Sequence, residues 1–193
     1  MFAAPGYERL WERLLESHTQ TKIESGVPYV YVDYEGLHAS QSFLSLKRIM
    51  TRMNVQDLKP NEAFAFLVNH YHVLMLDNVA TSSGINSAAM TEIRNSLKKR
   101  ESRADFVLSD VYKHAPNLRF FSSVSPNIQV ENAVLEQIQK CVDVDSSVQI
   151  FRIDSWLDAH VSNKTELREM LKQTFPAINL GSYSLHITSS DPV

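Results

Sequence analysis

The segment that most constrains this chain is residues 63–76, which contain no Asp, Glu, Lys or Arg. Pro60 suits the first position of a helix, and Glu62 favours the positive end of the helix dipole. We therefore expect one helix from Pro60 to about Val79 that is apolar almost all round. Such a helix has to be buried on every side. A membrane span needs about 20 apolar residues, and this stretch also holds Asn69 and two histidines, so we expect a core helix.

Around this helix, apolar residues at helical spacing predict further one-sided helices. These stripes run over Tyr7 to Leu15, Phe43 to Met53, Met90 to Leu97 and Val130 to Cys141. Asn163 and Glu166 have capping-box spacing for a last helix, which Pro176 stops.

Runs of β-favouring residues predict a few short strands. We expect strands at Tyr29–Val32, Leu118–Phe121 and Tyr183–Ile187, and residues 148–153 are either extended or the start of a helix. The fold class is therefore α+β. We expect a helix-rich single globular domain over residues 1–187, with a few short strands forming a small sheet. A flexible C-terminal tail should follow at residues 188–193.

The composition excludes several kinds of binding site. Among the five glycines the closest pair, Gly26 and Gly36, is too widely spaced for a phosphate-binding loop or a dinucleotide motif. A single cysteine leaves no internal disulfide and no cysteine-pair zinc site. The net charge of −3 argues against a dedicated nucleic-acid binder. We therefore expect no cofactor, no metal and no nucleic-acid partner, and we expect other protein subunits as partners.

The chain shows no secretory signal, because its N-terminus lacks a basic stretch followed by an apolar core. No apolar run is long enough for a membrane span. We expect an intracellular protein, either cytoplasmic or organellar. Its oligomeric state is left open by the sequence.

Four polar or reactive side chains in apolar segments are expected to be structural. On a helix, His70 and His72 point about 200° apart, which is the wrong geometry for one metal ion. Asn69 and His72 should instead form hydrogen bonds inside the protein. Cys141 lies on an apolar stripe at the negative end of a helix, before acidic residues, so its pKa should be raised and a core role is expected.

Four segments carry a family resemblance. Val32-Asp33-Tyr34 precedes Leu37, residues 65–72 read A-F-L-V-N-H-Y-H, and residues 183–186 read Y-S-L-H. Together with Val148, Ile150, Ile153 and Trp156, they resemble, in the same order, segments of the family catalogued as domain of unknown function 547. The family's segments are V-D-Y-x-x-L, A-F-W-I-N-x-Y-N, V-x-L-x-x-I-x-x-W and W-S-L-N.

The chain departs from that family where the family is richest in cysteine. The family pattern there is N-C-x-x-x-S-C-P, whereas residues 121–126 read F-S-S-V-S-P. The resemblance thus implies a divergent member that lacks the family's cysteines and the thiol or metal chemistry they would support. Two family asparagines correspond to His72 and His186. We expect these two side chains to pack near each other and to tie the long helix to the last strand.

Two functions follow from these observations. The first is a non-catalytic protein-interaction or structural module within a larger intracellular assembly, a pseudoenzyme in its family, with Tyr29, Tyr31 and Phe151 as exposed contact residues. The alternative is a hydrolase or transferase with a Ser–His site in a family pocket. Its catalytic residues would be His72, His186, Ser122 and Ser125. We favour the first because the sequence shows no complete catalytic motif.

Overall fold

The fold is α+β and rich in helix, as predicted. The computed structural model describes residues 6–24, 27–81, 88–109, 116–161 and 163–188. The α-helices in these residues are α1 (Gly6–His18), α2 (Tyr34–Ala39), α3 (Gln41–Arg52), α4 (Pro60–Ala80), α5 (Ala88–Lys98), α6 (Pro126–Cys141), α7 (Ser155–His160) and α8 (Lys164–Thr174). The short 3-10 helices are η1 (Val55–Asp57), η2 (Ala104–Phe106) and η3 (Leu180–Ser182). The strands are β1 (Thr19–Glu24), β2 (Val27–Val32), β3 (Val142–Asp145), β4 (Ile150–Asp154) and β5 (Ser184–Thr188).

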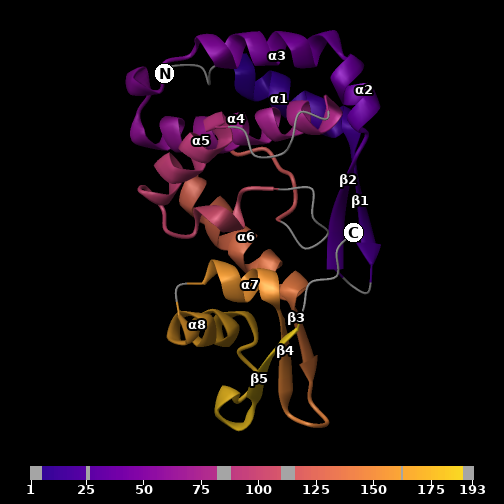
Figure 1. Cartoon of the computed structure of the whole chain (residues 1–193), viewed down its shortest axis with the longest axis vertical. Coiled ribbons are helices and arrows are strands. Elements are labelled where there is room, and N and C mark those ends of the chain that lie inside the picture. The colour runs from indigo at the N-terminus through magenta and orange to yellow at the C-terminus, as the bar shows by residue number, and fades with distance from the viewer. Residues whose placement is uncertain (1–5, 25–26, 82–87, 110–115, 162, 189–193) are drawn as a thin grey trace.

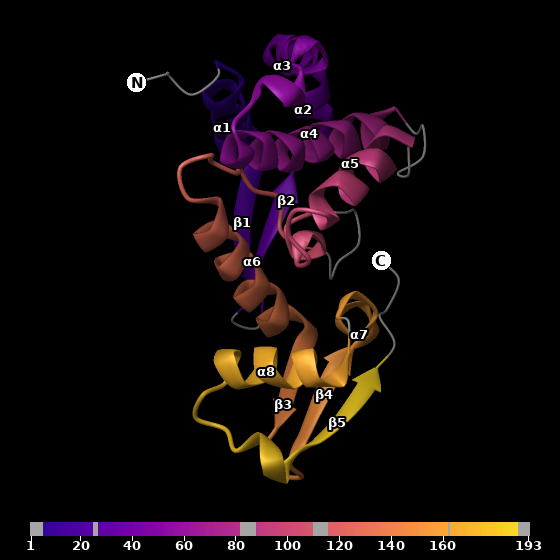
Figure 2. The same cartoon turned by 90° about the vertical axis from the view of Figure 1, so that its left-hand side faces the viewer.

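Helix α4 lies in the middle of the helical end of the molecule, with α1, α2 and α3 to one side and α5 to the other (Figures 1 and 2). The prediction of an almost fully buried helix is confirmed. From Ala63 to Leu76 every residue is buried except His70 and Leu74, which are half-buried. The ring of Tyr7 in α1 packs edge to face on Phe66 of α4 at a centroid distance of 5.5 Å.

Helix α6 connects the two ends of the molecule. It begins beside the helical end and reaches the opposite end, where α7, α8 and the strands β3, β4 and β5 lie (Figures 1 and 2). Its buried stripe includes Val130, Val134, Ile138 and Cys141, as predicted. One buried cluster extends from Tyr7 in α1 to Leu171 in α8, so both ends share one core. Among the helices that the structure describes, none combines the length and the apolar character needed to cross a membrane.

The strands form two small sheets rather than the one predicted. Strands β1 and β2 make an antiparallel hairpin. The second sheet has the order β3-β4-β5, with β5 parallel to β4 because α7 and α8 intervene between them. The predicted last strand is present and includes Thr188, which pairs with Asp154, so that residue does not belong to the predicted tail. Residues 189–193 lie outside the described residues.

The predicted strand at Leu118–Phe121 is wrong, since this segment is irregular. A side chain of α4 takes the place of a neighbouring strand. The Asn69 side chain accepts a hydrogen bond from Phe121 N–H at 2.9 Å and donates one to the Phe121 carbonyl at 2.7 Å. Trp11 Nε1 donates to the same Asn69 oxygen at 3.2 Å. The predicted internal hydrogen bonding of Asn69 is therefore confirmed, and it fixes the segment on α4.

Replacing Asn69 with Ala is expected to lower the free energy of unfolding by roughly 3 kcal/mol, because three buried polar groups lose their partner. Urea denaturation measures this change. Asn127→Ala, on the exposed side of α6, is the matched control and should shift the value by less than about 0.5 kcal/mol. Equal, small effects of both substitutions would contradict the role of Asn69.

Candidate interaction site

Two of the predicted contact residues, Tyr29 and Tyr31, lie on strand β2 of the hairpin. Val30 and Val32 of this strand pack against the core, whereas residues 20–23 of β1 are all exposed. A two-stranded hairpin is at best marginally stable by itself. Its position therefore depends on the contacts of β2 with the rest of the protein.

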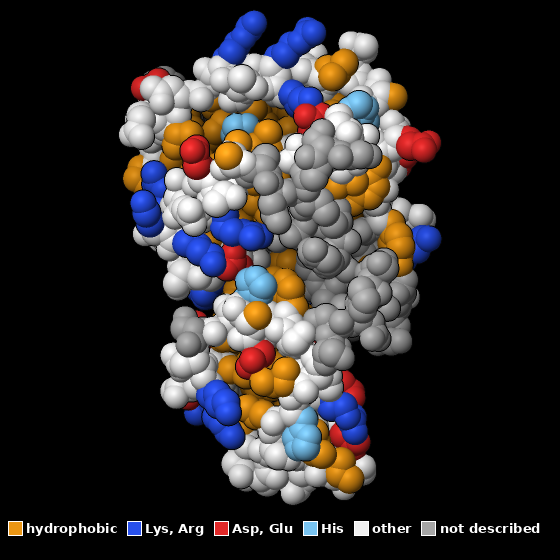
Figure 3. All heavy atoms as spheres, in the orientation of Figure 1, with side chains coloured by type: hydrophobic (Ala, Val, Ile, Leu, Met, Phe, Trp, Pro, Cys, Tyr) orange, Lys and Arg blue, Asp and Glu red, His pale blue; other side chains and the backbone are white. Residues whose placement is uncertain are grey.

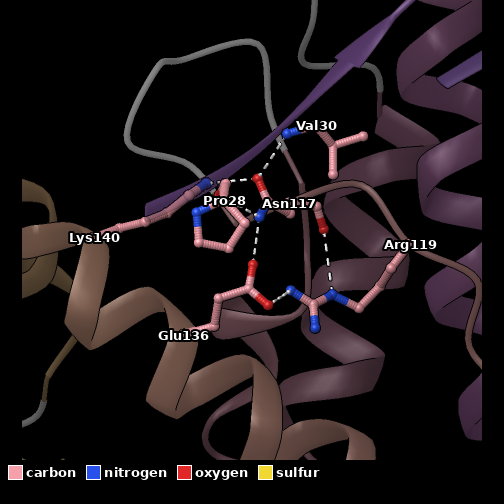
Figure 4. A network of polar contacts seen from close by, with 6 residues as sticks. All are labelled: Pro28, Val30, Asn117, Arg119, Glu136 and Lys140. Atoms are coloured by element: carbon pink, nitrogen blue, oxygen red, sulfur yellow. Dashed lines mark hydrogen bonds and ion pairs between the residues drawn. The ribbon is translucent and has the colours of Figure 1, made fainter. Parts of the chain in front are cut away.

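Asn117 holds the outer side of β2. Its Oδ1 accepts a hydrogen bond from Val30 N–H at 3.3 Å, and its Nδ2 donates to the Pro28 carbonyl at 3.0 Å (Figure 4). A side-chain amide thus satisfies the two backbone groups that a third strand would otherwise pair with. The residue is 8% exposed, so these hydrogen bonds are shielded from water.

Two residues of α6 complete the network around Asn117. Lys140 Nζ donates to Asn117 Oδ1 at 2.7 Å, and Asn117 Nδ2 also donates to the Glu136 carboxylate (Figure 4). Arg119 pairs with the other oxygen of Glu136 at 2.9 Å. The amide oxygen of Asn117 therefore has two donors and its nitrogen two acceptors, which is its full hydrogen-bonding capacity. The network joins the hairpin, the 116–122 segment and α6.

Lys140 is the most unusual titratable group of this site. The residue is 9% exposed, and burial lowers the pKa of its amine to about 8, against the opposing effect of nearby Glu136. Its Nζ lies 4.8 Å from the centroid of the Tyr29 ring. Tyr29 is therefore half-buried, contrary to the expectation of an exposed contact residue, and anchors the hairpin. Tyr31 is 43% exposed, with Lys22 Nζ 4.6 Å from its ring centroid.

The free edge of the hairpin follows from the geometry at Asn117. In an antiparallel pair, the N–H and C=O of one residue point to the same side, and residues directly opposite behave alike. The Val30 N–H and the Pro28 carbonyl point away from β1, so the N–H and C=O groups of their partners Thr21 and Ile23 point away from β2. No hydrogen bond joins these outward groups to another described residue. Ile23 is also 75% exposed.

The predicted Ser–His residues do not form a site in the described part of the chain. His72 is fully buried, and its Nε2 lies 3.1 Å from both the Val107 carbonyl and Ser109 N–H. Its Nδ1 has no hydrogen-bond partner, so neither ring nitrogen contacts a serine hydroxyl. Burial lowers the pKa of His72 to about 4. Ser122 Oγ instead accepts a hydrogen bond from Val124 N–H, and the Ser125 hydroxyl makes no capping bond at the start of α6.

The expectation that His72 and His186 pack together is wrong. His186 is exposed on β5, where it lies opposite Arg152 in the parallel register. Helix α4 and strand β5 are at opposite ends of the molecule (Figures 1 and 2). The last strand joins the edge of β4 and does not approach α4, so it has no contact with the long helix to stabilise.

Phe151 is not an exposed contact residue, contrary to expectation, because it is 0% exposed. It lies in β4, the middle strand of its sheet, and its ring packs against Tyr183 at 5.0 Å and Phe175 at 5.7 Å. Cys141 behaves as predicted. It is buried, and burial raises the pKa of its thiol to about 12, with a further contribution from Asp154 rather than from the acidic residues that follow it. In the residues that the structure describes, no group of three or more His, Cys, Asp or Glu could hold a metal ion.

Sequence reasoning missed the residues that hold the hairpin. Glu136 and Lys140 are four positions apart on a helix, a spacing typical of a solvent-exposed ion pair. Nothing in that pattern signals that Lys140 is buried and bonded to Asn117. Asn117 itself belongs to no recognisable motif. The one available signal was the β-favouring run at Tyr29–Val32, which located β2 but neither its partner β1 nor its anchor.

Comparison of the chain with protein-family models, with curated proteins and with solved structures finds no match. The resemblance to domain of unknown function 547 therefore stays a prediction.

A pH series tests the buried position of Lys140. Between its folded pKa of about 8 and its ordinary value of 10.5, the unfolded chain binds more protons than the folded chain. Stability conferred by this group therefore rises with pH in that window. The unfolding free energy of the wild type minus that of Lys140→Met should increase from about pH 7 to about pH 10 in urea titrations. Lys164→Met, at an exposed position of α8, is the control, and a pH-independent difference for Lys140→Met would contradict burial of the amine.

Proposed function

We propose that this chain is a non-catalytic protein-interaction module that binds an extended segment of a partner protein at the free edge of β1. We further propose that it does so as a subunit of a larger intracellular assembly. The observation that carries the proposal is the outward-facing backbone at Thr21 and Ile23, which pairs with no other described residue, beside an exposed isoleucine side chain.

An edge strand of this kind is a template for a further strand. The N–H and C=O groups of Thr21 and Ile23 would pair with the backbone of the partner segment, and alternate side chains would set the specificity. Ile23 would supply the apolar contact that the centre of an interface needs. Lys22 lies between them and is typical of the charged residues that keep an edge strand from pairing with itself.

The Asn117 network supports this function through preorganisation. Because β2 is fixed to the 116–122 segment and α6, β1 is presented without a large loss of conformational freedom on binding. The alternative of a Ser–His enzyme has no comparable support. Both nitrogens of His72 are buried in the core, and β5, the strand that contains His186, lies at the opposite end of the molecule from α4 (Figure 1).

A proline substitution separates docking at β1 from the integrity of the hairpin. Thr21→Pro removes an N–H that points away from β2, so the pairing between β1 and β2 is kept while an added strand is blocked. Wild type and variant, each immobilised, are used to capture partners from a lysate of the native cell, with quantification by mass spectrometry. We expect Thr21→Pro to reduce capture of the specific partner by about tenfold or more.

Thr21→Val is the matched control, because it changes the side chain and keeps the backbone donor, and it should capture the partner as the wild type does. Exchange of the Tyr31 amide, which faces Gln20 of β1 across the hairpin, reports that the two strands stay paired in each variant. If Thr21→Pro with an intact hairpin captures the same partner as Thr21→Val, the edge of β1 is not the docking site.

A further inference from the structure

Helix α3 carries a basic face with no acidic residue of its own. Lys47, Arg48 and Arg52 are its charged residues, and its sequence contains no Asp or Glu. Lys47 is neutralised by Asp77 of α4, at a distance of 2.5 Å. Arg48 and Arg52 are exposed, and neither forms an ion pair with any residue that the structure describes. Lys and Arg side chains project from this end of the molecule (Figure 3).

The spacing of the two arginines is unfavourable for the isolated protein. They are four positions apart, where like charges destabilise a helix, although the helix dipole offsets part of this cost for Arg52 in the last turn. Helix α8 provides a contrast inside the same chain. Its exposed Arg168 and Lys172 have the same spacing, but the helix also contains Glu166 and Glu169. An anionic partner would relieve the repulsion on α3.

The basic face also surrounds a hollow. A groove of about 340 Å³ is lined by Leu44, Lys47, Arg48, Thr51 and Arg52. Leu44 is half-buried at this groove, and neighbouring Ile49 is 39% exposed. The site therefore combines an apolar contact with two guanidinium groups, each of which can bind a carboxylate in a bidentate manner.

From these features we infer that the α3 groove binds an acidic segment of a partner protein, which places an apolar side chain against Leu44 and carboxylates on Arg48 and Arg52. A membrane surface fits less well, because the apolar stripe of α3 is already in the core, with Phe43, Leu46 and Met50 at most 1% exposed. Nucleic acid fits less well because none of the described residues that line the groove is aromatic and the chain carries a net charge of −3. This site is separate from the β1 edge and does not depend on it.

The test uses a fluorescein-labelled peptide in which glutamate pairs flank a single leucine, followed by anisotropy. We expect binding that weakens with added salt. The double substitution Arg48→Glu/Arg52→Glu should weaken it by about tenfold or more. Arg168→Glu/Lys172→Glu is the matched control, with the same charge change at the same spacing on α8, and should leave binding unchanged. Thr21→Pro should also leave it unchanged, which separates this site from the proposed function.

Peptides with serine in place of the leucine, or lysine in place of the glutamates, should bind at least several-fold more weakly. Absence of binding by the Glu–Leu peptide, or an equal loss in the α3 and α8 variants, would overturn the inference. Tighter α3-dependent binding of anionic phospholipid vesicles or of single-stranded RNA would overturn the assignment to a protein segment. Circular dichroism of each variant shows that the folds compared are the same.

Discussion

The structure depends on the enclosure of α4, a helix with no charged residue between Ala63 and Leu76. Water cannot solvate such a helix favourably on any side, so helices and irregular segments have to surround it. The hydrophobic effect is non-directional, but two buried polar residues of α4 impose a specific arrangement on the segments around it. Asn69 binds the backbone of Phe121, and His72 lies against Val107 and Ser109. Two segments without regular structure are thereby fixed to one helix.

This arrangement extends from the core to the surface. Phe121 is fixed on α4, and Asn117, in the same irregular segment, is placed between α6 and the hairpin. Asn117 then satisfies the outer backbone groups of β2, and the register of the hairpin turns the equivalent groups of β1 toward solvent. The position at which the buried Asn117 side chain is held therefore determines that the edge at Thr21 and Ile23 is exposed. A binding surface can therefore be rigid although it lies on a two-stranded hairpin.

Features set by local periodicity could be predicted from the sequence, and features set by distant partners could not. The apolar residues located α1, α3, α4, α5 and α6, the capping-box spacing of Asn163 and Glu166 located α8, and the β-favouring run at Tyr29–Val32 located β2. The segment at Leu118–Phe121 has the composition of a strand, but its backbone pairs with the Asn69 side chain and so stays irregular. From the sequence alone, Phe151 is predicted to be a surface aromatic residue. The strand order β3-β4-β5 instead places it in the central strand. The burial of Lys140 depends on Asn117, which is remote in sequence.

The hairpin is fixed along β2 and open along β1, and residue-resolved amide hydrogen exchange of the free chain is the most direct test of this arrangement. We expect a protected amide at Val30, which donates to the buried Asn117 oxygen, and rapid exchange at Thr21 and Ile23, whose N–H groups face away from β2. Strong protection at Thr21 and Ile23, or rapid exchange at Val30, would contradict it.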